Sequence, residues 1–162
     1  METEGEFDRL FCDLLPRLYR RAVLLVGEAW AEDAVHEAYL KLRRRPERLM
    51  EHPAPYAYAF AAMTSVVRDH WRAGRRQVLV PQPAEPPGND GGIAAREGLL
   101  DAGRLLSMLP TRQAAAVLLV DLDGYTIDEA AEILGVHRGT ISRGRARALE
   151  KLRGQVQRRA VR

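Results

Sequence analysis

The chain has 162 residues, of which 46% are apolar and 29% are charged, and its formal net charge is +3. A single cysteine excludes an intrachain disulfide, and the longest apolar runs are far too short to span a bilayer. The acidic start METEGE is no secretory signal, so we expect a cytoplasmic protein without membrane insertion. Length and abundant helix-forming residues predict an all-α fold of two small helical domains.

Side chains suited to catalysis are not grouped in this sequence. Its four histidines are scattered, and neighbouring residues assemble no phosphate loop, nucleophile elbow or metal-ligand cluster. We therefore expect no enzyme activity, no catalytic residue, no metal site and no cofactor.

Three helices are predicted before residue 76. Apolar residues recur at helical spacing from Phe7 to Val26, and Pro16 is expected to kink or restart this first helix. A second helix is predicted from about Trp30 to Arg44, with Val35, Ala38, Tyr39 and Leu42 facing inward, and a third near Tyr56 to Arg75.

The end of the third helix interleaves basic and aromatic residues. Cations can follow phosphates while rings stack on unpaired bases, so this pattern favours contact with a single nucleic-acid strand. Tyr58 and Phe60, which precede this segment, are interpreted as core residues. The residues assigned to the strand are Arg68, Trp71, Arg72, Arg75 and Arg76.

A Pro- and Gly-rich stretch, Gln77–Gly92, separates the two halves and carries no helical or strand periodicity. It predicts a flexible linker at 77–92 between domains at 1–76 and 93–162. In a polyproline-like form such a tether would reach roughly 50 Å, enough to hold two DNA-reading units apart.

The segment from Thr126 to Leu152 has the spacing of a helix-turn-helix. Thr126 and Glu129 form a predicted capping box, Gly135 can end the first helix in the left-handed conformation, and a second helix follows from about Arg138. If Ile141, Ala148 and Leu152 face inward, an arginine-rich face is left for a DNA major groove. The outward residues are Arg138, Ser142, Arg143, Ala146 and Arg147.

Charge alternates along the chain in four blocks. The net charge is −5 over residues 1–40, +6 over 41–76, −6 over 77–136 and +8 over 137–162. An acidic block followed by a basic block occurs twice along the chain. This repetition favours two modules, each with a basic surface for nucleic acid and an acidic surface available to a protein partner. Solvated helix faces remain the alternative explanation for any single block.

Two motifs in this order resemble the sigma factors of bacterial RNA polymerase, in particular the minimal extracytoplasmic-function (ECF) group. Residues Phe7 to Arg76 look like the family's region 2, and AEDAVHEAYLKL at Ala31–Leu42 stands where family members carry an AED-x-x-Q-E-x-F-L motif. Residues Leu105 to Arg153 look like region 4, with LPTRQ followed by YTIDEAAEILGVHRGTISRGRARALEKLR. The resemblance implies a transcription initiation factor that binds core RNA polymerase and promoter DNA.

The resemblance also implies roles for individual residues. Asp69 and Arg72 match the family's D-x-x-R near the −10 reading head, where a DNA strand is opened. Arg138, Thr140 and Arg143 match the start of the helix that reads the −35 element. The surface that docks on the polymerase clamp would be formed by Asp33, Glu37, Leu40 and Lys41.

Several positions depart from the family pattern. Ser65 stands where asparagine is usual, Ala114 replaces an arginine, and Gly144 falls inside the recognition helix. Residues Ala57–Val67 contain no basic side chain, which keeps a second hypothesis open. In that alternative the chain is a DNA-binding regulator, or a degenerate sigma-like protein that does not initiate transcription. ECF factors are commonly held by an anti-sigma factor, although no residue here identifies one.

Overall fold

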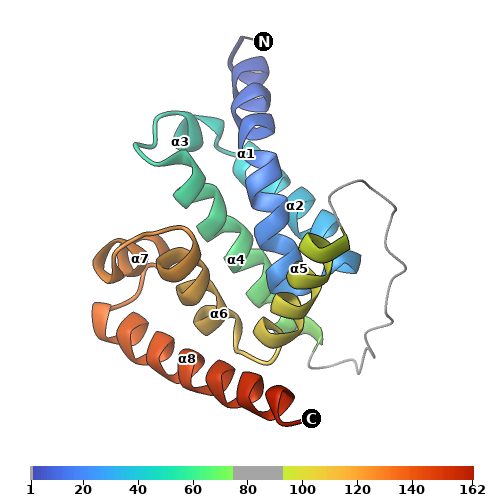
Figure 1. Ribbon diagram of the computed structural model, residues 1–162. Coiled ribbons are helices and arrows are strands. Elements are labelled where there is room, and N and C mark those ends of the chain that lie inside the picture. Colours follow the sequence, from blue (N-terminus) through green and yellow to red (C-terminus); the bar gives the residue numbers. More distant parts are fainter. Residues whose placement is uncertain (1, 75–92) are drawn as a thin grey trace.

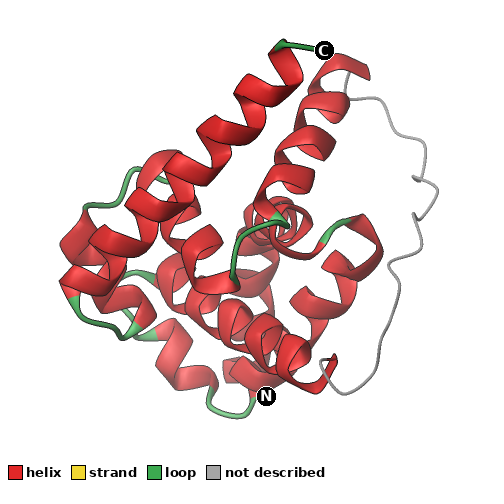
Figure 2. Cartoon of the chain, turned by 90° about the horizontal axis from the view of Figure 1, so that it is seen from below, coloured by secondary structure: helices red, strands yellow, loops and turns green. Residues whose placement is uncertain are grey.

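The computed structural model describes residues 2–74 and 93–162, and every regular element in these ranges is helical (Figures 1 and 2). The predicted linker, Gln77–Gly92, lies outside the described residues, as do Arg75 and Arg76. The all-α prediction is therefore confirmed for the described part of the chain. None of the helices in the described ranges combines the length and the apolar composition that a membrane span requires.

The N-terminal unit is built from four helices: α1 (Glu2–Val26), α2 (Glu28–Arg43), α3 (Pro46–Met50) and α4 (Pro55–Gly74). Gly27 alone separates α1 from α2, and its φ of 82° is a conformation that favours glycine. This single residue lets α2 fold back against α1. The largest fully buried side chains of the unit are Phe7, Phe60, Leu18, Leu49, Met63 and Val67.

Pro16 lies inside α1, and the helix continues through it to Val26. The expectation that the helix restarts there is wrong. Proline removes one backbone hydrogen bond from a helix, but most helical stability in proteins comes from packing of an apolar face. Leu18 and Ala22, just after Pro16, are fully buried, and their burial offsets the missing bond.

The C-terminal unit contains α5 (Ile93–Leu106), α6 (Thr111–Val117), the short π-helix η1 (Leu118–Leu122), α7 (Ile127–Leu134) and α8 (Arg138–Ala160). Every residue from Ala114 to Leu119 is buried, so α6 and η1 form the centre of this unit. The long helix α8 packs across α6 and α7.

The helix-turn-helix formed by α7 and α8 has the geometry predicted from sequence. The Glu129 amide donates to Thr126 Oγ1 at 3.1 Å, and the Thr126 amide donates to Glu129 Oε2 at 2.9 Å. Gly135 ends α7 with a left-handed φ of 64°, and α8 begins at Arg138. The capping box, the glycine stop and the start of the second helix are therefore confirmed.

The two units pack against each other (Figure 1). Helix α5 lies on α1, where a Cβ atom at Gly103 would be 3.7 Å from the Val23 carbonyl oxygen, and α4 contacts α6 and α7. Buried apolar residues of both units join one hydrophobic cluster. The sequence suggested two reading units held apart, whereas this structure shows them in contact.

Candidate nucleic-acid interface

Helix α8 has one buried face and one exposed basic face. Ile141 and Ala148 are almost fully buried against the rest of the unit, and Leu152 is half-buried. The side chains on the opposite face point to solvent, as the helical periodicity predicted. The exposed candidates for DNA contact are Arg138, Thr140, Ser142, Arg143 and Arg147.

The arginines of α8 differ in their partners. Arg145 Nε donates to Asp121 Oδ2 at 2.8 Å, which fixes α8 to η1, and this hydrogen bond raises the pKa of Arg145. Arg138 pairs with the exposed Asp128 at 2.6 Å. Within the described residues, Arg143 and Arg147 have no carboxylate partner. These two guanidinium groups can therefore bind phosphate or guanine without breaking an existing ion pair.

The basic end of α4 combines an exposed ring with partly shielded cations. Trp71 is 50% exposed, and Asp69 and Arg72 are also exposed. Burial, followed by the charges of Arg112 and Arg72, lowers the pKa of the half-buried Arg68. Arg112 belongs to α6, so the C-terminal unit adds positive charge beside the end of α4. This arrangement suits an unpaired strand that offers both phosphates and bases.

The earlier aromatic residues of α4 have other surroundings. Phe60 is fully buried, as interpreted from sequence, and Tyr56 is 7% exposed. Tyr58 is half-buried and stacks on His52 with ring centroids 4.9 Å apart. These rings therefore belong to the packing of the N-terminal unit, and Trp71 is the exposed ring next to the arginines.

The residues assigned to polymerase docking share one exposed face of α2. Asp33, Glu37, Leu40 and Lys41 follow helical spacing, and Leu40 is 47% exposed. Lys41 Nζ donates to Ser65 Oγ at 2.9 Å, which connects this face to α4. Asp33 and Glu37 also line a small cavity of about 80 Å³ with Trp30 and His70, whose ring centroids are 4.6 Å apart. The face thus combines acidic groups with exposed apolar surface.

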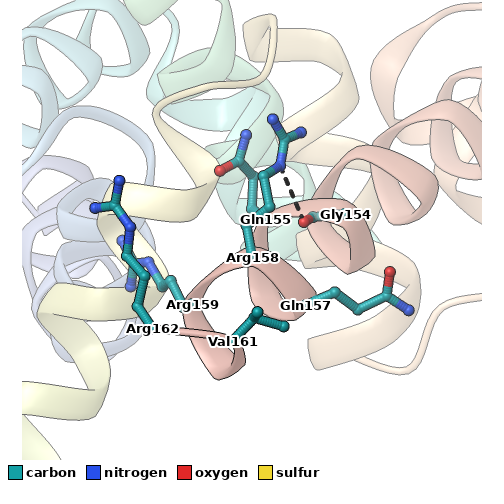
Figure 3. Close-up of a pocket in the computed structure, with 7 residues that line it drawn as sticks. All are labelled: Gly154, Gln155, Gln157, Arg158, Arg159, Val161 and Arg162. Atoms are coloured by element: carbon teal, nitrogen blue, oxygen red, sulfur yellow. Dashed lines mark hydrogen bonds between the residues drawn. The ribbon is translucent and has the colours of Figure 1, made fainter.

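The C-terminal end of α8 forms a second basic surface (Figure 3). Arg158 Nε donates to the Gly154 carbonyl at 3.3 Å, and Arg159 lies 3.6 Å from Asp101 of α5. The figure shows the side chains of Arg159 and Arg162 on one side of the helix end and Gln157 on the other. A single continuous segment, residues 154–162, supplies all of these groups, so we assign the hollow no role beyond added positive charge.

Sequence reasoning missed a polar cluster centred on Asp123, at the end of η1. Its carboxylate accepts hydrogen bonds from Arg17, Arg21 and Tyr56, all in the N-terminal unit. Burial acts to raise the pKa of Asp123, but hydrogen bonds from Arg21 and Tyr56 outweigh it and hold the pKa below its usual value. Asp123 is at least 67 positions away from these residues in the sequence, so no local sequence pattern predicts the cluster.

Taken together, these surfaces are those expected of a helical DNA-binding protein. The C-terminal unit carries a helix-turn-helix whose Arg143 and Arg147 have no carboxylate partner among the described residues, α4 ends in a basic and aromatic surface, and α2 has an exposed acidic face. No cluster of three or more potential metal-ligating side chains occurs in the described ranges, 2–74 and 93–162.

Comparison with known proteins identifies the class more closely. Residues 10–77 match the family model for Sigma-70 region 2, and residues 99–152 match the model for Sigma-70, region 4. The ECF RNA polymerase sigma factor SigM of Mycobacterium tuberculosis is 31% identical over 147 residues, which are 90% of this chain and 74% of that protein. The SigM sequences of strains Erdman and H37Rv give the same values.

Two solved structures share the fold. The sigma factor RpoE of Bartonella quintana, in complex with the anti-sigma factor NepR, has a TM-score of 0.75 at 24% identity, over 94% of this chain and 97% of that one. CnrH in complex with the cytosolic domain of CnrY has a TM-score of 0.66 at 20% identity, over 95% and 89% of the two chains. These similarities show the same two-unit helical fold.

The chain belongs to the ECF family of RNA polymerase sigma factors. It is a sigma factor that directs RNA polymerase to promoters, as its motifs indicated. Sigma factors are not enzymes, so this membership also confirms the prediction that the chain has no catalytic function.

Proposed function

We propose that three separate surfaces of this chain perform the work of an initiating sigma factor. The exposed face of α8 reads the −35 element, the end of α4 holds an opened strand of the −10 element, and the outer face of α2 docks on core polymerase. We assign the first domain to residues 1–76, the linker to 77–92 and the second domain to 93–162. The unpaired arginines on the exposed face of α8 carry this proposal most strongly.

The −35 assignment rests on the different interactions that the arginines of α8 make. Arg145 holds the helix on η1 through Asp121, so the helix has a fixed orientation. Arg143 and Arg147 lie on the exposed side without an acidic partner in the described part of the chain. A rigid helix that presents unpaired guanidinium groups suits bidentate contacts with guanine in the major groove.

The −10 assignment rests on Trp71 and the arginines beside it. An exposed tryptophan can stack on a base that has left the duplex, and Arg72 can hold the neighbouring phosphate. Arg75 and Arg76 extend the basic sequence, although they lie outside the described residues. In this proposal the free energy of binding opens the strand, and the sigma factor itself hydrolyses no nucleotide.

The docking assignment makes a prediction about α2. Asp33→Arg reverses one charge of the exposed acidic face. We expect about tenfold weaker capture of core polymerase, because an acidic face complements a basic partner surface and arginine would be repelled by it. A pull-down with core polymerase measures the effect. Glu32→Arg is the matched control, since Glu32 is also exposed on α2 but lies outside the assigned face. Equal losses in both variants would contradict the assignment.

The rival hypothesis of a non-initiating protein rested on the lack of basic residues in Ala57–Val67. In the structure every side chain of that stretch is buried or half-buried, and none is exposed. Charged residues are costly at such positions, so packing accounts for their absence. The lack of basic residues, which favoured the hypothesis of a non-initiating protein, therefore has a structural explanation.

The relatives also suggest a partner. RpoE of Bartonella quintana is bound to the anti-sigma factor NepR, and CnrH is bound to CnrY. We propose that this chain also binds an anti-sigma factor. We further propose that it acts in the cytoplasm, together with RNA polymerase.

Run-off transcription tests the proposed function. Purified core polymerase is supplied with a genomic fragment library, with and without this protein, and the transcript starts are sequenced. We expect new, discrete starts that share two upstream elements. Retained core binding without new starts would favour the non-initiating rival, and no core binding would leave only a DNA-binding regulator.

A further inference from the structure

An exposed ion pair joins the two helices of the helix-turn-helix. Arg138, the first residue of α8, donates from Nε to Asp128 Oδ1, in the first turn of α7, at 2.6 Å. The Arg138 and Asp128 side chains are 64% and 71% exposed to solvent. Ion pairs this exposed contribute little to folding stability, so stability alone does not explain the contact.

The ion pair occupies only one edge of the Arg138 guanidinium. A guanidinium group carries its N–H donors on a planar fork, and Nε supplies only one of them. Within the ranges 2–74 and 93–162, Arg138 donates a side-chain hydrogen bond to Asp128 alone, and its two Nη groups donate none. The outer end of the fork, which carries both Nη atoms, can therefore bind two acceptors side by side.

Arg145 pairs with a carboxylate in a different way. Both Nε and Nη2 of Arg145 donate to Asp121, and these two side chains are only 30% and 28% exposed. That contact engages both carboxylate oxygens and holds α8 on η1. The pair at Arg138 instead orients an exposed guanidinium and leaves its outer end unoccupied.

The backbone that carries Arg138 is fixed by the residues around it. Gly135 turns the chain with a φ of 64°, and His137 Nδ1 accepts from the Gly139 amide at 3.0 Å. A Cβ atom at Gly139 would lie 3.2 Å from His137 Nδ1, so glycine leaves room for this cap. The start of α8 thus has a defined position, and the ion pair with α7 sets the direction of its first side chain.

We propose that Asp128 is a positioning residue for promoter recognition: it orients Arg138 so that both Nη groups donate to O6 and N7 of one guanine in the −35 element. A bidentate contact of this kind is the commonest specific arginine contact in the major groove. A side chain that is already oriented loses less conformational entropy on binding, and the approach of DNA removes water that screens the ion pair. The proposal rests on the proposed function of α8 as the reader of this element.

The Asp128 carboxylate also acts on DNA through its charge. A negative charge near the duplex repels phosphates whatever the base sequence, so its removal strengthens binding to every duplex. Orientation of Arg138, in contrast, affects only the base pair that the guanidinium contacts. The ratio of affinities for two duplexes that differ in this one base pair cancels the effect of charge and isolates the effect of orientation.

Competition binding with the full chain measures this ratio. The reference duplex is one that the wild-type protein selects from a random pool, and each G·C pair of its −35 element is replaced in turn by A·T. Arg138→Ala identifies the contacted pair, because discrimination at that pair alone should fall about tenfold. Asp128→Ala should lower discrimination at the same pair about fivefold, while it binds all of the duplexes more tightly.

Asp128→Asn separates the two effects of the carboxylate. Its amide oxygen can still accept from Arg138 Nε but carries no charge, so this variant should retain more of the discrimination than Asp128→Ala does. Glu132→Gln is the matched control for charge, because Glu132 is also exposed on α7 and forms no ion pair among the described residues. It should leave the ratio unchanged.

Loss of discrimination at one shared base pair in Arg138→Ala and Asp128→Ala, partly restored in Asp128→Asn, supports the proposal. An unchanged ratio in Asp128→Ala would overturn it, since the carboxylate then acts through charge alone, while a loss in Arg138→Ala would still leave α8 as the reader. If Arg138→Ala changes no ratio, the proposal also fails. The proposed function of α8 fails with it only if the double variant at Arg143 and Arg147 keeps full duplex affinity.

Discussion

The recognition face of α8 and the basic end of α4 both expose arginines, but they are built differently. Helix α8 follows the Gly135 turn, is capped at its start by His137 Nδ1, which accepts from the Gly139 amide, and is held along its length by the Arg145–Asp121 pair. The end of α4 instead exposes Trp71, and Arg68 is half-buried beside other positive charges.

This difference matches two kinds of nucleic acid. A duplex offers fixed base edges in a groove, so a rigid helix with unpaired guanidinium groups can read it. An opened strand offers flat, unstacked bases, so an exposed ring with cations around it can hold it. We therefore propose that two surfaces of similar basic composition serve two distinct functions in one small chain.

The largest expected effect concerns the unpaired arginines of α8. The double variant Arg143→Ala and Arg147→Ala should weaken binding of the full chain to promoter duplex about 100-fold, because two base or phosphate contacts are lost. Each lost phosphate contact should also reduce the salt dependence of binding by about one unit of slope. A salt titration with fluorescence anisotropy measures both quantities, and unchanged affinity would remove the assignment of α8 to DNA.

A smaller effect is expected at Trp71. Trp71→Ala should weaken binding of a single-stranded −10 oligonucleotide roughly tenfold, since base stacking on an aromatic side chain is lost. Binding to a duplex that carries the −35 element should stay the same. Trp30→Ala is a useful comparison, because Trp30 is 39% exposed but packs beside His70 in the small cavity. Equal losses for both tryptophans would contradict a specific role for Trp71.

The start of α7, the first helix of the helix-turn-helix, can be weakened through its cap. Thr126→Ala removes the side-chain acceptor for the Glu129 amide and should lower the free energy of unfolding by about 1 kcal/mol. Chemical denaturation measures this change. Thr111→Ala is the matched control, because the start of α6 has no side-chain cap, and it should have a clearly smaller effect.

The smallest expected effect is a gain in stability at Gly144. A Cβ atom at this position would lie 3.7 Å from Gln113 Cγ, an ordinary contact, so Gly144→Ala should raise the free energy of unfolding by up to about 1 kcal/mol. Gly124→Ala should have the opposite sign, since its φ of 78° is strained for other residues. Loss of stability in both variants would show that Gly144 is needed for close packing of α8.

Local features of the fold were predictable from sequence because their causes are local. The Thr126 cap, the Gly135 turn and the inward positions of α8 depend on neighbours within a few residues. The uninterrupted course of α1 through Pro16 was not predictable, because it depends on burial of the residues that follow. Contact between the two units, with Asp123 at its centre, depends on residues 67 to 106 positions apart, and no periodicity carries that information.

Permanganate reactivity of promoter DNA tests the central claim that the two basic surfaces have separate functions. The reagent detects unpaired thymines in complexes of core polymerase with wild-type protein, with Trp71→Ala, or with the double variant at Arg143 and Arg147, while footprinting reports occupancy. We predict that Trp71→Ala retains protection of the −35 element but loses reactive thymines near −10, and that the double variant loses both signals. Loss of −35 protection in Trp71→Ala, or normal opening in both variants, would contradict the account.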